Sequence, residues 1–137
     1  MFCDHFHVNY ELLYFLRGRA RFEIGARQYQ LKPKTLLIIP PGTHHQGFVD
    51  PSEDYERIVI NFSLRDISPL LLEPLRHCPT ALDVAGSELE ELFDEFNLQE
   101  EKYRNEILLQ EMRKCTLARI LLLLCFEDTK SCQEECR

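Results

Sequence analysis

The feature of this sequence that most constrains its fold is a change of hydrophobic period about halfway along the chain. Between residues 5 and 62, apolar and polar side chains alternate over short stretches that end at glycine or proline. After Ser87, apolar side chains recur at intervals of three and four residues. Alternation is typical of half-buried strands, and the longer interval is typical of one face of a helix. The chain is therefore predicted to be mostly β, with α-helices toward its C-terminal end.

The first half of the chain is predicted to form strands at residues 5–16, 19–24, 28–31, 35–39, 45–49 and 55–62. Turn signals separate these strands, notably Gly18, Gly25, Pro33 and the Pro40-Pro41-Gly42 sequence. Short strands at such close spacing are typical of an antiparallel barrel or sandwich.

The second half is predicted to be helical, with one or two short turns at residues 66–76 and two longer helices. Ser87 and Glu90 have the spacing of a capping box, which places the start of one helix. A longer helix is expected at about residues 101–127, and its last turns, at residues 120–126, are apolar on all sides. Either its own domain wraps this helix or the helix is half of an interface, and we favour the interface.

Size and charge exclude several classes of protein. The 137 residues suit one domain, and the longest uncharged apolar run, at residues 120–126, is too short to span a membrane. The net charge of −7 arises in residues 83–137, where 14 acidic side chains face 7 basic ones, so this chain alone is a poor candidate for binding nucleic acid. The N-terminus does not resemble a secretory signal, so we expect a reduced, cytoplasmic protein in which Cys132 and Cys136 belong to an uninvolved tail.

One group of side chains has the composition of a metal site. His5 and His7 are two residues apart, so on a strand they share a face, and Glu11 has the same parity. The turn before His45 brings in another imidazole. Three imidazoles and one carboxylate are a sound set of ligands for a divalent metal, and they leave two positions of an octahedral ion for water or ligand.

The same residues resemble the cupin family. His5, His7, Glu11 and Gly18 match the first cupin motif, H-x-H-x3-E-x6-G, without a gap. The second motif, G-x5-P-x-G-x2-H-x3-N, is kept at its proline, glycine and histidine, the last being His45. It departs at its two ends, where Lys34 replaces the leading glycine and Val49 replaces the closing asparagine. The resemblance implies a metal site formed by His5, His7, Glu11 and His45.

A longer stretch is similar to the effector-sensing domain of AraC-type transcription regulators. Residues 5–48, from HFHVNYELLYFLRGRARFEIG to IIPPGTHHQGF, carry the likeness, and two helices follow as in that family. The resemblance implies a cupin-type, jelly-roll-like antiparallel barrel that binds a small effector, often a sugar, and helices that form a homodimer. It also implies DNA binding through a helix-turn-helix domain beyond Arg137, so we expect this chain to be an excised sensor domain.

Two interpretations of the histidines and the glutamate stay open. They bind a divalent metal such as Zn, Ni, Fe, Mn or Co, or they line an effector pocket without metal. Parity places further side chains toward the barrel interior, where core packing is the simpler expectation for each and lining of the ligand pocket is the alternative. These pocket candidates are Cys3, Leu13, Phe15, Phe22 and Tyr29.

The resulting hypothesis divides one structural domain into a cupin barrel at residues 1–64 and a helical segment at residues 65–137 that forms the dimer contact. The dimer contact is predicted at Leu108, Cys115, Leu121 and Leu122. The predicted function is effector sensing and dimerisation in a transcription regulator, without enzymatic activity. The alternatives are a stand-alone metal-dependent cupin enzyme, acting as an isomerase, epimerase or dioxygenase, and a metal-free sugar-binding or storage cupin.

Overall fold

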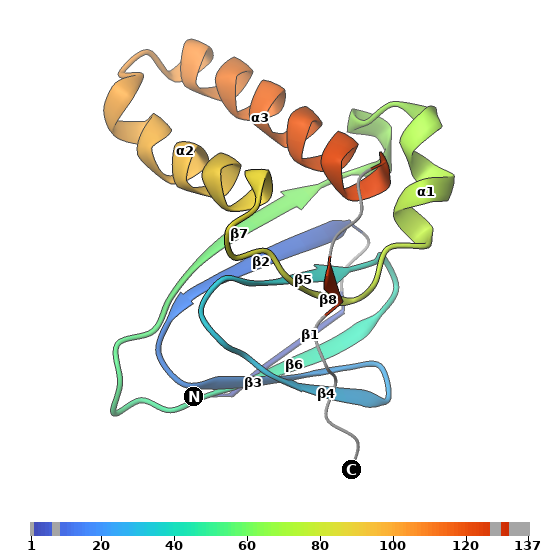
Figure 1. The fold of residues 1–137 in the computed structure, drawn as a ribbon, viewed down its shortest axis with the longest axis vertical. Coiled ribbons are helices and arrows are strands. Elements are labelled where there is room, and N and C mark those ends of the chain that lie inside the picture. Colours follow the sequence, from blue (N-terminus) through green and yellow to red (C-terminus); the bar gives the residue numbers. More distant parts are fainter. Residues whose placement is uncertain (1, 7–8, 127–129, 132–137) are drawn as a thin grey trace.

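Two antiparallel sheets and a cap of helices make up the computed structural model (Figure 1). The structure describes residues 2–6, 9–126 and 130–131, with only the backbone of residues 2–6 and 130–131. The strands are β1 (Phe2–Phe6), β2 (Tyr10–Arg17), β3 (Ala20–Ile24), β4 (Arg27–Gln30), β5 (Thr35–Ile39), β6 (His44–Val49), β7 (Glu56–Phe62), β8 (Ala81–Asp83) and β9 (Lys130–Ser131). The helices are α1 (Leu72–Arg76), α2 (Glu88–Lys102) and α3 (Glu106–Phe126), preceded by 3-10 turns at Leu64–Asp66 and Pro69–Leu71.

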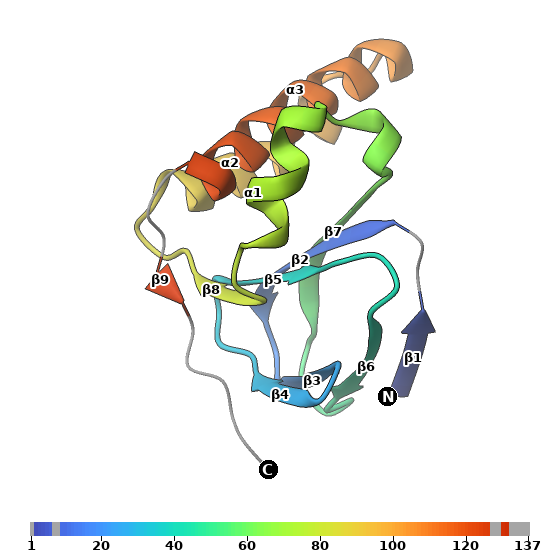
Figure 2. The same ribbon diagram turned by 90° about the vertical axis from the view of Figure 1, so that its right-hand side faces the viewer.

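The two sheets face each other, and the helices cover one of them from outside. Sheet A has the strand order β1-β6-β3-β4, and sheet B has the order β7-β2-β5-β8-β9. Figure 2 shows sheet A below sheet B, with the helices on the outer side of sheet B. The predicted fold class, an antiparallel barrel-like β fold followed by helices, is confirmed.

Strand β2 is buried on both faces because it separates two cores. Its odd-numbered residues Leu13 and Phe15 belong to the inner core, which lies between the sheets. Its even-numbered residues Tyr10, Leu12 and Tyr14 belong to the outer core, between sheet B and the helices. Alternation along the strand therefore assigns the two faces, as the sequence predicted.

The order of elements differs from the prediction in two places. Residues 5–16 were expected to be a single strand, but β1 lies in sheet A and β2 in sheet B, so the chain changes sheets between them. Strand β8 comes from the segment that we expected to be purely helical. It pairs with β5, with Leu36 opposite Leu82, and extends sheet B past the expected boundary at residue 64. Three residues are too few to show a periodicity of their own.

Both long helices begin with polar contacts, although not with those the sequence suggested. Helix α2 starts after Ser87 as predicted, but the Ser87 hydroxyl donates to the carbonyl of Val84 and does not cap the helix. The Glu90 carboxylate instead accepts from the backbone N–H of Gly86 at 2.9 Å. Helix α3 starts at Glu106 and not near residue 101, because the Asn105 side chain accepts from the N–H of Leu108 at 3.0 Å.

Two turns have a backbone that disfavours most side chains. Gly18, the glycine of the first motif, has φ of 116°, and a Cβ there would lie 2.7 Å from the carbonyl oxygen of Asp54. Lys34, at the position where the second motif has glycine, has φ of 70°. It is the one non-glycine residue with positive φ among the described parts of the chain.

No helix in the described part of the chain is long and apolar enough to cross a membrane.

Candidate functional site

The candidate site is formed where the two sheets face each other. Glu11 is on β2 in sheet B, and His45 is on β6 in sheet A. Their side chains meet between the sheets, with Nε2 of His45 3.6 Å from Oε2 of Glu11. Only 1% of His45 and 7% of Glu11 is exposed. A carboxylate and an imidazole this deeply buried require polar or charged partners, so their meeting marks the interior as more than apolar packing.

Sheet pairing fixes the backbone on both sides of this pair. Glu11 is paired with Ile39 of β5 and Asn61 of β7, so it sits within sheet B and not at an edge. His45 is paired with Ile24 of β3 and with His5 of β1. Side chains held on paired strands have less freedom than side chains on loops, so the positions of the two side chains are well defined.

The structure brings together two of the four predicted metal ligands. His5 occupies the register position opposite His45, but only its backbone is described, and His7 lies outside the described residues. Within the described residues, no group of three or more His, Cys, Asp or Glu side chains is placed to hold a metal ion. The adjacent His44 is exposed, as alternation along the strand predicted.

Four of the five pocket candidates lie in the inner core, between the same two sheets as the Glu11–His45 pair. Leu13, Phe15, Phe22 and Tyr29 are 2%, 0%, 7% and 6% exposed and belong to the inner core. The Phe22 ring lies over Gly47, close enough that a Cβ on Gly47 would be 2.8 Å from its Cζ. The fifth pocket candidate, Cys3, lies where only the backbone is described. The described pocket candidates are therefore buried apolar side chains of the inner core.

The donor types and their burial fit two of the ligands of a divalent metal. An imidazole and a carboxylate suit several first-row ions, and the two groups lie 3.6 Å apart. The same pair fits a polar ligand, because the carboxylate accepts from hydroxyl groups and the imidazole offers either a donor or an acceptor.

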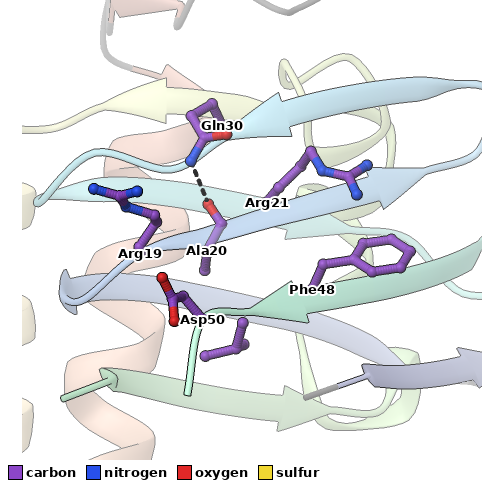
Figure 3. Close-up of a pocket in the computed structure, with 7 residues that line it drawn as sticks. Arg19, Ala20, Arg21, Gln30, Phe48 and Asp50 are labelled. Carbon is purple, nitrogen blue, oxygen red and sulfur yellow. Dashed lines mark hydrogen bonds between the residues drawn. The ribbon is translucent and has the colours of Figure 1, made fainter. Parts of the chain in front are cut away.

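A hollow lies on the outer face of sheet A, away from the Glu11–His45 pair (Figure 3), and has a volume of about 560 Å³. The Arg21 guanidinium lies 4.2 Å from the centre of the Phe48 ring, and Gln30 donates to the carbonyl of Ala20 at 3.1 Å. The arginines here have acidic neighbours, since Arg19 pairs with Glu53 at 3.1 Å and Arg21 with Glu23 at 3.2 Å. These contacts are those of a solvated strand face, and the stacking on Phe48 had no signal in the sequence.

The predicted dimer residues divide between surface and core. Leu108 and Leu122 are 47% and 50% exposed, and Cys115 is exposed on the same helix. Leu121 is 0% exposed and packs in the outer core, so it is not available for a contact between copies. The apolar run at residues 120–126 carries no polar residue that would reveal which side faces the core, which is why periodicity did not separate Leu121 from Leu122.

Comparison with known proteins adds one family match. The model of the AraC-like ligand binding domain matches residues 2–111. Two solved structures of the ribosomal oxygenase YcfD from Escherichia coli, one with cobalt and succinic acid and one with cobalt and 2-oxoglutarate, are similar at 20% and 19% identity. They cover 90% and 88% of this chain with TM-scores of 0.39 and 0.40, and this chain spans about a third of theirs, 35% and 34%. A likeness this weak carries no argument about activity. No curated protein gave a significant match.

Proposed function

The chain belongs to the family of AraC-like ligand-binding domains, and from this premise we propose that it senses a small polar effector between its two sheets. The observation that supports this site is the buried meeting of Glu11 and His45, 3.6 Å apart. Burying two such groups is unfavourable unless they are paired or bound to a ligand. An effector with hydroxyl groups would donate to the Glu11 carboxylate and exchange hydrogen bonds with the His45 imidazole.

We further propose that a divalent metal joins this site. His5, His7, Glu11 and His45 would hold it, and a bound metal would supply a Lewis acid that attracts an effector oxygen. Glu11 and His45 would approach it from opposite sheets. Leu13, Phe15, Phe22 and Tyr29 would form the apolar walls, which exclude water and restrict the site to a compact ligand.

Metal content is the first test of this proposal. The purified protein would be examined by elemental analysis beside His45→Ala, the His5→Ala, His7→Ala double variant and the control His44→Ala, which changes an exposed neighbour. Near-stoichiometric metal in wild type and His44→Ala, lost from the other two, supports the metal site. Metal-free protein with a retained fold removes the metal from the proposal, and thermal-shift screening of sugars and carboxylic acids then tests the effector pocket alone.

The outward face of α3 is the proposed dimer contact. Leu108, Cys115 and Leu122 are spaced seven residues apart, so they form one seam on the exposed side of the helix. Because Cys115 is the midpoint, an antiparallel pair of such helices related by a two-fold axis there would place Leu108 against the partner's Leu122. The same symmetry would place Glu111 opposite the partner's Arg119, since the two lie four residues on either side of Cys115 and carry opposite charges.

In a longer regulator, effector binding would bias DNA-binding domains attached to this module. The coupling would require an effector that binds one arrangement of the dimer better than another. The stand-alone enzyme is the second candidate, and the metal analysis bears on it, because a metal-free protein would exclude metal-dependent turnover.

A further inference from the structure

A pair of thiols lies at the other end of the helical cap, apart from the Glu11–His45 site. Cys78 follows α1, and Cys125 is in the last turn of α3. Each thiol reaches the element of the other, because Cys78 bonds to the carbonyl of Leu124, next to Cys125, and Cys125 contacts the carbonyl of Leu71, just before α1. Both side chains are half-buried at the edge of the outer core, so they are neither sealed in nor fully open to solvent.

Backbone carbonyl oxygens surround this thiol pair. Sγ of Cys78 donates to the carbonyl of Leu124 at 3.3 Å and lies 3.6 Å from the carbonyl of Pro74. Sγ of Cys125 is 3.8 Å from the carbonyl of Leu71. The Leu124 carbonyl belongs to the last turn of α3, whose carbonyl groups have no partner within the helix and form the negative end of its dipole. The surroundings therefore favour a cation and disfavour an isolated thiolate.

The protonation of the thiols agrees with this environment. Burial raises the pKa of Cys78 above its usual value, and burial together with the neighbouring Cys78 raises the pKa of Cys125 to about 11. Burial also raises the pKa of Tyr10, a residue of the outer core against which both cysteines pack. Thiols that stay protonated are slow toward peroxide and disulfide exchange, because the thiolate is the reactive form. A cation that binds both sulfurs and displaces their protons would neutralise the negative charge of the two thiolates.

We propose that Cys78 and Cys125 form a two-thiolate site for a soft d10 cation, with Cu(I) as its representative. Binding forms two S–Cu bonds and releases one proton from each thiol, and no group is oxidised or reduced. Thiolate sulfur is the ligand that Cu(I) prefers over the harder donors of the Glu11–His45 site. The bound ion would tie α1 to the last turn of α3, the helix whose outward face is proposed as the dimer contact.

The test is an anaerobic competition titration of the full chain with Cu(I) against a chromophoric Cu(I) chelator. The variants are Cys78→Ser, Cys125→Ser and the control Cys115→Ser, which removes a thiol outside the pair. Because Cys115 lies in the proposed dimer contact, the control is compared with the wild type at a protein concentration where both have the same oligomeric state. Serine keeps a donor for the Leu124 carbonyl, so the Cys78 variant retains the structural hydrogen bond and loses only the sulfur ligand. We expect the affinity of one equivalent of Cu(I) to fall at least about 10-fold in the first two variants and to be unchanged in the control.

A second measurement on the wild type keeps the proposal testable if a variant does not fold. Maleimide labelling followed by peptide mass spectrometry reports each cysteine separately, and Cu(I) should slow the labelling of Cys78 and Cys125 about 10-fold or more while Cys115 is unaffected. Cu(I) held only by other cysteines, equal affinity in all variants, or a Cys78–Cys125 disulfide formed under mild peroxide without Cu(I) protection would each overturn the proposal.

Discussion

Glu11 and His45 belong to different sheets, yet Oε2 of one lies 3.6 Å from Nε2 of the other in the interior of the barrel. Neither residue approaches the other through a local turn, since 34 positions separate them in the sequence. Their contact depends on sheet A closing against sheet B. An effector bound at this pair, as proposed, would therefore stabilise the packing of sheet A against sheet B.

Replacing the carboxylate tests the site without changing its shape. Glu11→Gln keeps the side-chain volume and loses the negative charge. We expect its affinity for Zn²⁺ to fall by at least about 10-fold, because even the loss of a residue that only hydrogen-bonds to a metal ligand typically lowers metal affinity by about 10- to 100-fold. The measurement is competition with a chromophoric chelator. Glu23→Gln is the control, because Glu23 lies on a strand next to β6 but pairs with Arg21 on the outer face. Equal affinity in both variants would contradict a role for Glu11.

Truncating the adjacent leucines Leu121 and Leu122 of α3 should have very different effects on stability. Leu121 is 0% exposed in the outer core, so Leu121→Ala should lower the free energy of unfolding by about 2–5 kcal/mol at any protein concentration. Leu122 is 50% exposed, and Leu122→Ala should change the stability of the isolated chain by less than about 0.5 kcal/mol. Urea unfolding at several protein concentrations separates the two effects. A large, concentration-independent loss in Leu122→Ala would show that this leucine faces the core.

A charge on the outward seam of α3 should dissociate the proposed dimer. Leu122→Asp places carboxylates where two copies would bury leucine, so sedimentation should show a monomer with an unchanged circular dichroism spectrum. Leu70→Asp is the matched control, since Leu70 is 81% exposed but lies in the 3-10 turn before α1. The control should sediment like the wild type. A dimeric Leu122→Asp protein, or a wild type that is monomeric, would refute this interface.

The close approach of Phe22 to Gly47 should make a single methyl group destabilising. A Cβ at position 47 would lie 2.8 Å from Cζ of the Phe22 ring, so Gly47→Ala should lower the free energy of unfolding by about 1–3 kcal/mol through overpacking. Adding Phe22→Leu should recover part of that loss, because the shorter side chain leaves room for the methyl group. Chemical denaturation of the two single variants and the double variant measures the coupling. If the stability losses of Gly47→Ala and Phe22→Leu simply add in the double variant, the contact between the two residues is not the cause of the first loss.

The sequence predicts elements well where one face of the chain is apolar. Strand β5 has the predicted bounds, Thr35–Ile39, and the parity of β2 gives the right division between inner and outer faces. Long-range placement is harder to predict. The pairing of β8 with β5 and the core position of Leu121 depend on which surfaces meet in three dimensions, and a short or uniformly apolar segment carries no signal for that. The candidate site was predictable at Glu11 and His45 because a motif with fixed spacing names them.

The departure from the second motif at Lys34 has a structural explanation that leads to the last prediction. Lys34 adopts φ of 70°, a conformation that glycine favours and that costs another residue about 1–2 kcal/mol. Its ammonium group donates to Oε2 of Glu90 at 2.7 Å and so links the strand region to α2. The hydrogen bond with Glu90 raises the pKa of Lys34, and the same bond is the main reason why the pKa of Glu90 is lowered. At this position the unfavourable backbone conformation of Lys34 is accompanied by an ion pair that glycine could not form.

Two substitutions separate the backbone effect from the ion pair. Lys34→Ala keeps the unfavourable φ and loses the ion pair, whereas Lys34→Gly loses the ion pair and relieves the backbone. Because glycine also increases the conformational freedom of the unfolded chain, Lys34→Gly should exceed Lys34→Ala in stability by roughly 0.5–1 kcal/mol at every pH.

The wild type should be more stable than Lys34→Ala at neutral pH, where Lys34 and Glu90 are both charged. Since the folded pKa of Glu90 is below its unfolded value of 4.5, that advantage should disappear as the pH falls through the folded pKa. Urea unfolding at pH 7 and at acid pH measures both differences, and a wild-type advantage over Lys34→Ala that persisted in acid would show that the ion pair is not its source.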